Sequence, residues 1–122
     1  MSLAFCKLQS INKDTFSNLK MVKTINLSNN QLAELPVNSF SGCLQLELLS
    51  LSGNHIHSLA QNQFAALASL RRIDLSNNWL EFVHREAFNN LGSSVHMIDL
   101  GNNLLQTMME VTFLPLTGLQ VG

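Results

Sequence analysis

One pattern of apolar residues, asparagine and phenylalanine recurs along this 122-residue chain, and it constrains the fold more than any other feature. Counted from Leu70, apolar residues stand at positions 1, 4, 6, 11, 14 and 22, asparagine at position 9 and phenylalanine at position 19. The full turns are residues 22–45, 46–69, 70–94 and 95–118, with a partial turn over 1–21 and the start of a further strand at 119–122. The 24-residue period, one residue longer near 92–94, indicates a solenoid and predicts a single domain over 1–122.

The spacing within each turn predicts a strand with one buried face. Apolar positions 4 and 6 alternate with positions 3, 5 and 7, as side chains do on the two faces of a strand. Copies stacked side by side form a parallel sheet with strands about 4.8 Å apart. Because no single turn can bury its own apolar residues, we expect each turn to be stabilised by its neighbours.

Position 9 falls where the strand ends and the backbone bends, leaving peptide groups that no regular ladder can satisfy. An asparagine side chain offers one acceptor and two donors, so stacked asparagines can bond the backbone within and between turns. We therefore expect a structural role for this ladder, which consists of Asn30, Asn54, Asn78 and Asn103. Cys6 takes this position in the partial turn, and we expect Cys6 and Cys43 to be buried free thiols.

The period and the L-x-x-N-x-L-x-x-L-P-x-x-x-F rhythm allow a comparison with a known family. The segment LSNNQLAELPVNSF (27–40) matches best, and 51–64, 75–88 and 100–113 lose only the proline. The chain resembles the typical leucine-rich repeats of Toll-like receptors, variable lymphocyte receptors and small leucine-rich proteoglycans. The resemblance implies an α/β-type solenoid, a short curved coil with a parallel β-sheet on the concave face and irregular or short helical turns on the convex face. It also implies that partners bind the concave face.

Composition narrows the classes of partner. The net charge is −1 and only 12% of residues are charged, which argues against nucleic acid as a partner. No apolar run approaches the roughly 18 residues that span a bilayer, so we expect no membrane insertion. The repeat subtype favours an extracellular or secreted protein. The cysteine-rich caps of secreted relatives are missing, however, and this leaves a cytoplasmic location open.

Outward positions that the repeat does not prescribe are the candidate binding residues. Apolar, aromatic and arginine side chains there resemble the composition of protein interfaces, whereas isolated apolar surface residues are ordinary. The predicted concave ligand-binding set is Leu48, Arg71, Arg72, Asp74, Trp79, Met97, Asp99 and Leu104.

Catalysis is the weaker interpretation of these residues. Asp74 and Asp99 share position 5 of adjacent turns, a spacing reminiscent of paired glycosidase carboxylates. An open sheet, however, gives no cleft that excludes water, and Arg72 can neutralise Asp74. His55 and His57 have no evident third ligand, so we expect no metal site. We also expect no cofactor and no catalytic residue.

The ends of the coil raise the question of assembly. The strand near 96–100 is expected to leave an unpaired edge, which a larger parent protein, the chain's own tail or a second copy could cover. We predict a homodimer through one end, with an end face formed by His96, Ile98, Leu105, Met108, Met109 and Val111. Asn26-Leu27-Ser28 is a sequon, so Asn26 is either a glycosylation site or plain strand surface.

Taken with the resemblance, these features predict a non-catalytic recognition module that binds a protein or a microbial surface component, in innate immunity. The alternative is a structural or adaptor scaffold for protein–protein interaction without an immune role.

Overall fold

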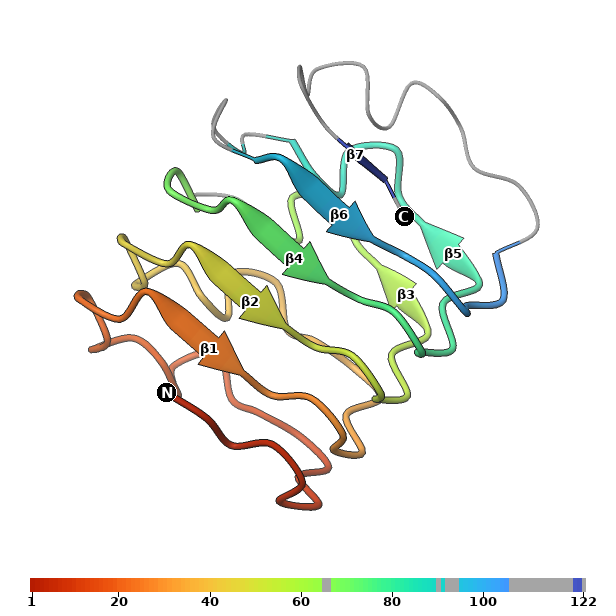
Figure 1. The fold of residues 1–122 in the computed structure, drawn as a ribbon, viewed down its shortest axis with the longest axis horizontal. Coiled ribbons are helices and arrows are strands. Elements are labelled where there is room, and N and C mark those ends of the chain that lie inside the picture. The colour runs from red at the N-terminus through yellow and green to blue at the C-terminus, as the bar shows by residue number, and fades with distance from the viewer. Residues whose placement is uncertain (65–66, 90, 92–94, 106–119, 122) are drawn as a thin grey trace.

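The computed structural model describes residues 1–64, 67–89, 91, 95–105 and 120–121. Four strands lie at the predicted place in successive turns: β1 (Thr24–Asn26), β2 (Leu48–Ser50), β4 (Arg72–Asp74) and β6 (Met97–Asp99). With β7 (Gln120–Val121) they form a parallel sheet in the order β1-β2-β4-β6-β7, seen face-on in Figure 1. The predicted leucine-rich-repeat solenoid is confirmed, and its described part contains no helix.

The register of the sheet follows the repeat. The central residues of β1, β2, β4 and β6 lie side by side across the sheet, with Ile25 opposite Leu49, Leu49 opposite Ile73, and Ile73 opposite Ile98. All four side chains are buried, while the residues at positions 3 and 5 on either side of them are exposed or half-buried. The third turn has one residue more than the first two, but β4 and β6 still pair in register.

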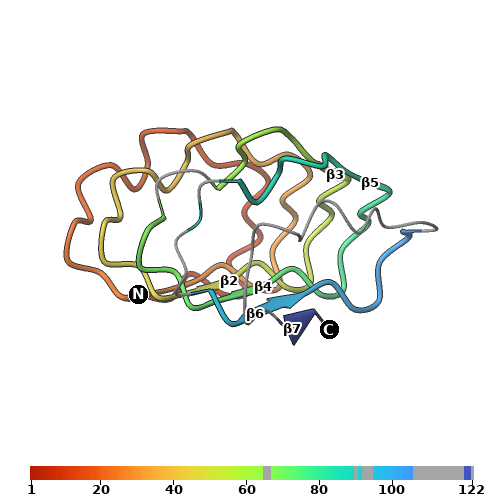
Figure 2. The ribbon, with the colours of Figure 1, turned by 90° about the horizontal axis from the view of Figure 1, so that it is seen from above.

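A second, smaller sheet lies on the opposite side of the coil (Figure 2). Here β3 (Ser58–Leu59) pairs in parallel with β5 (Phe82–Val83). Behind the main sheet the phenylalanines at position 19 fill the coil, with Phe16 stacked on Phe40 at 5.3 Å and Phe64 on Phe88 at 5.8 Å between ring centroids. These four rings are nearly fully buried, and they form the back of the core.

The asparagine ladder has the geometry that position 9 predicts. Asn78 Nδ2 donates to the carbonyls of Leu51 at 2.9 Å and Leu75 at 3.0 Å, and its Oδ1 accepts from Ile56 N at 3.1 Å. Leu51 O also accepts from Asn54 Nδ2, and Leu75 O from Asn103 Nδ2, so each carbonyl is shared by successive asparagines. The ladder therefore links neighbouring turns as well as closing each bend.

The residue before each ladder asparagine adopts a left-handed backbone, a feature that the sequence analysis did not predict. The φ values are 57° at Asn29, 71° at Gly53, 56° at Asn77 and 55° at Asn102. Only glycine and, less easily, asparagine tolerate this region without a large steric cost. The dipeptides Asn-Asn and Gly-Asn in these turns therefore combine a left-handed bend with a ladder residue.

The chain's own tail covers the β6 edge, which is one of the three outcomes that the sequence left open. Met97 and Ile98 pair with Gln120 and Val121 of β7, where the start of a further strand was predicted. One part of the predicted end face is wrong, because Ile98 is fully buried. His96 is exposed and Leu105 half-buried, whereas Met108, Met109 and Val111 lie outside the described residues. The homodimer stays a prediction, but the β6 edge that motivated it is paired.

The two cysteines differ in exposure, which corrects the expectation that both are buried. Cys43 is buried in the core, and Cys6 is exposed. The backbone N of Cys6 donates to Asn30 Oδ1 at 3.0 Å, so the first turn still uses the ladder. Both thiols are free, as expected.

Thiol labelling should distinguish the two sites. Burial raises the pKa of the Cys43 thiol, because the apolar interior disfavours the thiolate that reacts. We expect a maleimide to modify Cys6 rapidly in the folded protein and Cys43 only after urea unfolding. A Cys6→Ser variant, read by intact mass, should lose the fast reaction. Rapid labelling of that variant would contradict the burial of Cys43.

Candidate binding surface

The predicted ligand-binding residues lie on three distinct surfaces rather than one. Position 2 residues line the edge where the strands begin, which we call the leading edge. Positions 3, 5 and 7 form the outer face of the sheet, the sheet face. Position 10 lies past the asparagine bend, on the trailing edge. Arg71 is therefore on the leading edge, Trp79 and Leu104 are on the trailing edge, and the sheet face holds Leu48, Arg72, Asp74, Met97 and Asp99.

The sheet face combines an arginine with apolar neighbours. Arg72 is paired in register with Leu48 on β2 and Met97 on β6. Leu48 is 44% exposed, a large value for an apolar residue in the middle of a sheet. A hollow of about 320 Å³ opens beside them, lined by Thr24, Ile25, Asn26, Leu48, Leu49, Ser50, Arg72 and Asp74.

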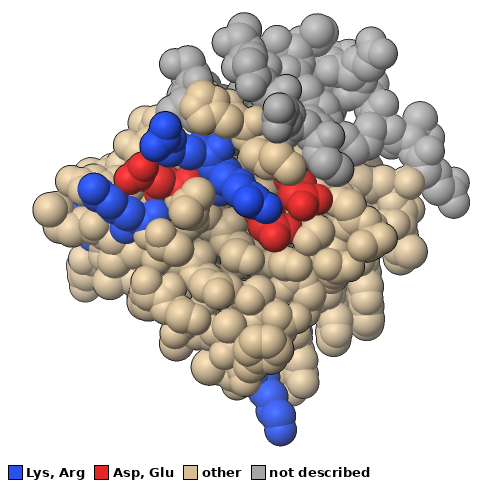
Figure 3. Space-filling view, in the orientation of Figure 1, with Lys and Arg blue, Asp and Glu red and all other residues tan. Residues whose placement is uncertain are grey.

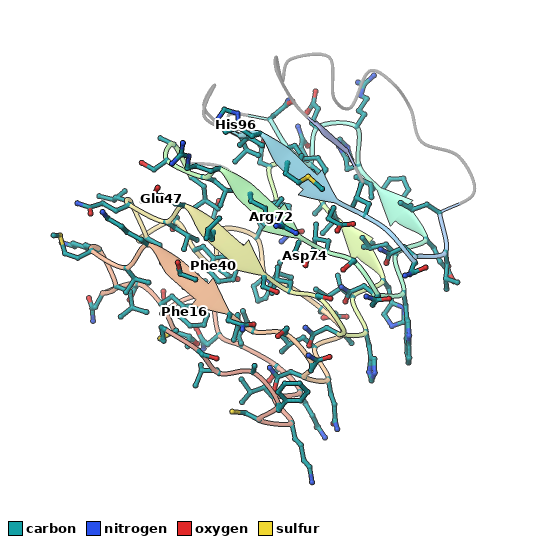
Figure 4. The ribbon with its side chains drawn as sticks, viewed as in Figure 1. Phe16, Phe40, Glu47, Arg72, Asp74 and His96 are labelled. Atoms are coloured by element: carbon teal, nitrogen blue, oxygen red, sulfur yellow. The ribbon has the colours of Figure 1, made fainter. Side chains whose placement is uncertain are left out.

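Arg72 is not neutralised in the way the sequence suggested. Among the described residues, Arg71 forms an ion pair with Glu47. No ion pair within 4.0 Å joins Arg72 to Asp74. Figure 4 shows Arg72 and Asp74 along the sheet, and Figure 3 shows the charged side chains gathered over the strands. The Arg72 guanidinium is thus available to a partner.

Asp74 and Asp99 are paired in register, as expected, but each is engaged with its own backbone. Asp74 Oδ1 accepts from Ser76 N at 3.0 Å and Ser76 Oγ at 2.6 Å, and Asp99 Oδ1 accepts from Gly101 N at 3.0 Å. These bonds are side-chain caps at the strand ends, of the kind that aspartate and asparagine form two residues on. A structural role therefore explains the pair without catalysis.

Asn26 makes the same cap in the first turn. Its Oδ1 accepts from Ser28 N at 3.0 Å and Ser28 Oγ at 2.6 Å. The side chain is half-buried and borders the hollow on the sheet face. The sequon residues are thus explained as strand-end structure, and glycosylation of Asn26 stays a prediction.

The trailing edge carries an aromatic stack between residues that the sequence analysis considered separately. His55 stacks on Trp79 with ring centroids 4.0 Å apart and planes 12° apart, and His57 meets the same indole edge-on at 5.4 Å. The spacing of 24 between His55 and Trp79 was the signal, because residues one period apart are neighbours in the column. Trp79 remains 45% exposed, and Leu104 follows it in the next turn.

The leading edge holds a second hollow, of about 480 Å³, lined by Lys23, Gln45, Glu47, Ala68, Ser69, Arg71 and His96. Arg71 Nη1 lies 3.6 Å from Glu47 Oε1. This hollow was not predicted from the sequence, which placed Arg71 among the ligand-binding residues and His96 on the end face. A hollow depends on the shape of the turns between strands, which the repeat pattern does not specify.

Within the described residues no group of three or more His, Cys, Asp or Glu side chains is arranged to hold a metal ion. In the same part of the chain no helix is long and apolar enough to cross a membrane.

Comparison with known structures gives neighbours of the same architecture. The crystal structure of a TLR13–ssRNA13 complex matches with a TM-score of 0.92 and 29% identity, over 98% of this chain and 17% of that chain. The Drosophila Toll–Spatzle complex matches with a TM-score of 0.84 and 25% identity, over 94% and 15%. The leucine-rich-repeat domain of APL1B matches with a TM-score of 0.88 and 21% identity, over 99% and 36%. The chain therefore spans a fraction of each neighbour's length.

No curated protein matches the chain significantly in sequence. The profile of the leucine-rich-repeat family, in contrast, matches residues 1–56, 45–96 and 69–121, which together extend over nearly the whole chain. The chain belongs to the leucine-rich-repeat family.

Proposed function

We propose that this chain is a non-catalytic recognition module that binds a protein ligand on its sheet face, as part of an extracellular innate-immune protein. The observation that carries the proposal is Arg72, an exposed arginine without an ion-pair partner among the described residues, set between Leu48 and Met97. Arginine beside apolar side chains is the composition of interface hot spots. The sheet supports these side chains rigidly, because β2, β4 and β6 are paired along their lengths.

The structural neighbours support an immune setting. Toll is found in complex with Spatzle in a structure described as a hub of Drosophila development and innate immunity. The TLR13 structure holds single-stranded RNA, which makes RNA the rival ligand class. The charge of this chain favours protein, since RNA binding requires several lysines or arginines that neutralise phosphates, and the net charge is −1.

Substitution of Arg72 tests the sheet face. The biotinylated chain, carrying a photo-crosslinking residue in place of Leu48, is exposed to secreted host proteins, to heat-killed bacteria, to lipopolysaccharide and to a single-stranded RNA oligonucleotide. We expect a protein to be cross-linked, and Arg72→Ala to weaken its binding by about thirtyfold, the loss typical of a hot-spot arginine. Biolayer interferometry with the identified protein measures the change.

Arg85→Ala is the matched control, because Arg85 is exposed on the turn after β5, on the side opposite the main sheet. Its affinity should equal that of the unmodified chain. If Arg72→Ala stays within twofold of this control, the sheet face is not the binding site. If RNA alone binds, and the binding falls steeply with salt, the ligand class is nucleic acid instead of protein.

A further inference from the structure

We propose that the hollow at the leading edge receives a carboxylate side chain of the protein that binds the adjoining sheet face. The inference rests on the proposed function and adds the chemistry of the partner: an acidic residue next to an apolar one. Its basis is a column of position-2 residues, Lys23, Glu47, Arg71 and His96, which line one hollow of about 480 Å³.

The backbone fixes the spacing of this column. Glu47 N donates to Lys23 O, Arg71 N to Glu47 O and His96 N to Arg71 O, each at 2.8 Å. Neighbouring strands of a sheet lie about 4.8 Å apart, so the side chains of the column start from evenly spaced points. Figure 4 shows Glu47 and His96 at the beginnings of their strands, on the same edge. The paired backbone therefore sets the spacing of this column, while Gln45, Ala68 and Ser69 from the turns between strands complete the lining of the hollow.

Arg71 retains binding capacity. Among the described residues, the ion pair of Arg71 runs from Nη1 to Glu47 Oε1 at 3.6 Å, and the Arg71 side chain is 58% exposed against 30% for Glu47. Such a pair near water contributes little to stability, and both side chains line the hollow. A guanidinium has five donors and binds carboxylates through two parallel hydrogen bonds, so the donors not facing Glu47 can engage a second carboxylate.

The net charge of the hollow selects the ligand. Among the lysine, arginine and carboxylate side chains that line the hollow, Lys23 and Arg71 contribute two positive charges and Glu47 one negative charge, which leaves +1. One positive charge matches one carboxylate. A polyanion such as RNA would instead meet Glu47 here and Asp74 and Asp99 on the sheet face, and its affinity depends on neutralising many phosphates.

Consecutive residues line the two hollows: Lys23, Glu47 and Arg71 line the leading-edge hollow, and Thr24, Leu48 and Arg72 line the hollow on the sheet face. A partner that places an acidic side chain beside Arg71 brings its neighbouring residue over Leu48, which is exposed and apolar. The leading edge thus sets the direction in which a partner segment lies across the sheet. Charge complementarity of this kind determines orientation and association rate more than total affinity.

A peptide titration tests the hollow without the natural partner. The capped dipeptide acetyl-Glu-Leu-amide, which carries one carboxylate beside one apolar side chain, is added to the ¹⁵N-labelled chain, and the dissociation constant is obtained from the amide shifts of Glu47, Arg71 and His96. We expect saturable binding that Arg71→Gln weakens by about tenfold and Glu47→Gln strengthens by about threefold, as one charge is removed in each direction. Arg85→Gln is the control and should leave the constant unchanged. Lys23→Gln, expected to weaken binding, is a second test should Arg71→Gln fold poorly.

The outcomes separate this inference from the proposed function. Equal shifts with inorganic phosphate at the same ionic strength, or an Arg71→Gln constant equal to that of Arg85→Gln, would overturn the carboxylate site. If Arg72→Ala still weakens the protein ligand in that case, the proposed function stands and only this inference fails. If the dipeptide binds as expected while Arg72→Ala has no effect on the protein ligand, the carboxylate site stands and the sheet-face proposal fails.

Discussion

Replacing Phe64 with alanine is expected to lower the free energy of unfolding by about 3–5 kcal/mol, the range measured for buried phenylalanines. Phe64 is 1% exposed and its ring stacks on Phe88 from the next turn, with centroids 5.8 Å apart. Removal of the ring leaves a cavity at the contact between two turns, and a solenoid turn has only its neighbours to close such a cavity. Since whole domains are stable by about 5–15 kcal/mol, much of the fold's stability depends on this one side chain.

Phe82→Ala provides the matched control, because it removes the same ring from a side chain that is 58% exposed. Urea unfolding followed by circular dichroism measures both variants. The control should stay within about 1 kcal/mol of the parent, as is usual for surface substitutions. Equal losses for the two variants would show that the phenylalanine column does not form the back of the core as the structure has it.

The core and the sheet could be predicted from the sequence because the same spacing of apolar residues recurs in every turn. Ile25, Leu49, Ile73 and Ile98 all occupy position 4, and a single alternation of apolar and polar residues specifies their burial in each turn. The one-residue slip before β6 was also visible, since the fixed positions resume in step. Because the same positions must be buried in every turn, an interpretation that holds for one turn applies to the others.

Features that occur once, or that depend on what lies beyond a turn, were not predictable in this way. Cys6 takes a ladder position, yet it is exposed, whereas Asn30, Asn54 and Asn78 at the same position are buried. The strands β3 and β5 are two residues long, too short to show any alternation. In contrast, the left-handed residues Asn29 and Asn77 did leave a signal, the asparagine or glycine before each ladder asparagine.

For the candidate binding surface, the sequence predicted which residues take part but not how they are arranged in space. Arg71 and Arg72 are adjacent in sequence, but they line different hollows. Trp79 was grouped with them, whereas the structure stacks it on His55 past the bend. Periodicity determines which residues share a column, and it leaves open how far apart the columns lie around the coil. Distances around the coil depend on the shape of each bend.

Replacing Asn78 with leucine is expected to lower the free energy of unfolding by about 2–3 kcal/mol, chiefly because the buried amide of Ile56 loses its acceptor. The carbonyls of Leu51 and Leu75 lose one donor each but keep another, from Asn54 and Asn103, so their contribution is smaller. Asn77→Gly is the matched control, since Asn77 is exposed and its φ of 56° suits glycine. Thermal unfolding should show a clear drop in midpoint for Asn78→Leu and little change for Asn77→Gly. An unchanged midpoint for Asn78→Leu would mean that the ladder only accompanies the bends, and that the apolar columns alone hold successive turns together.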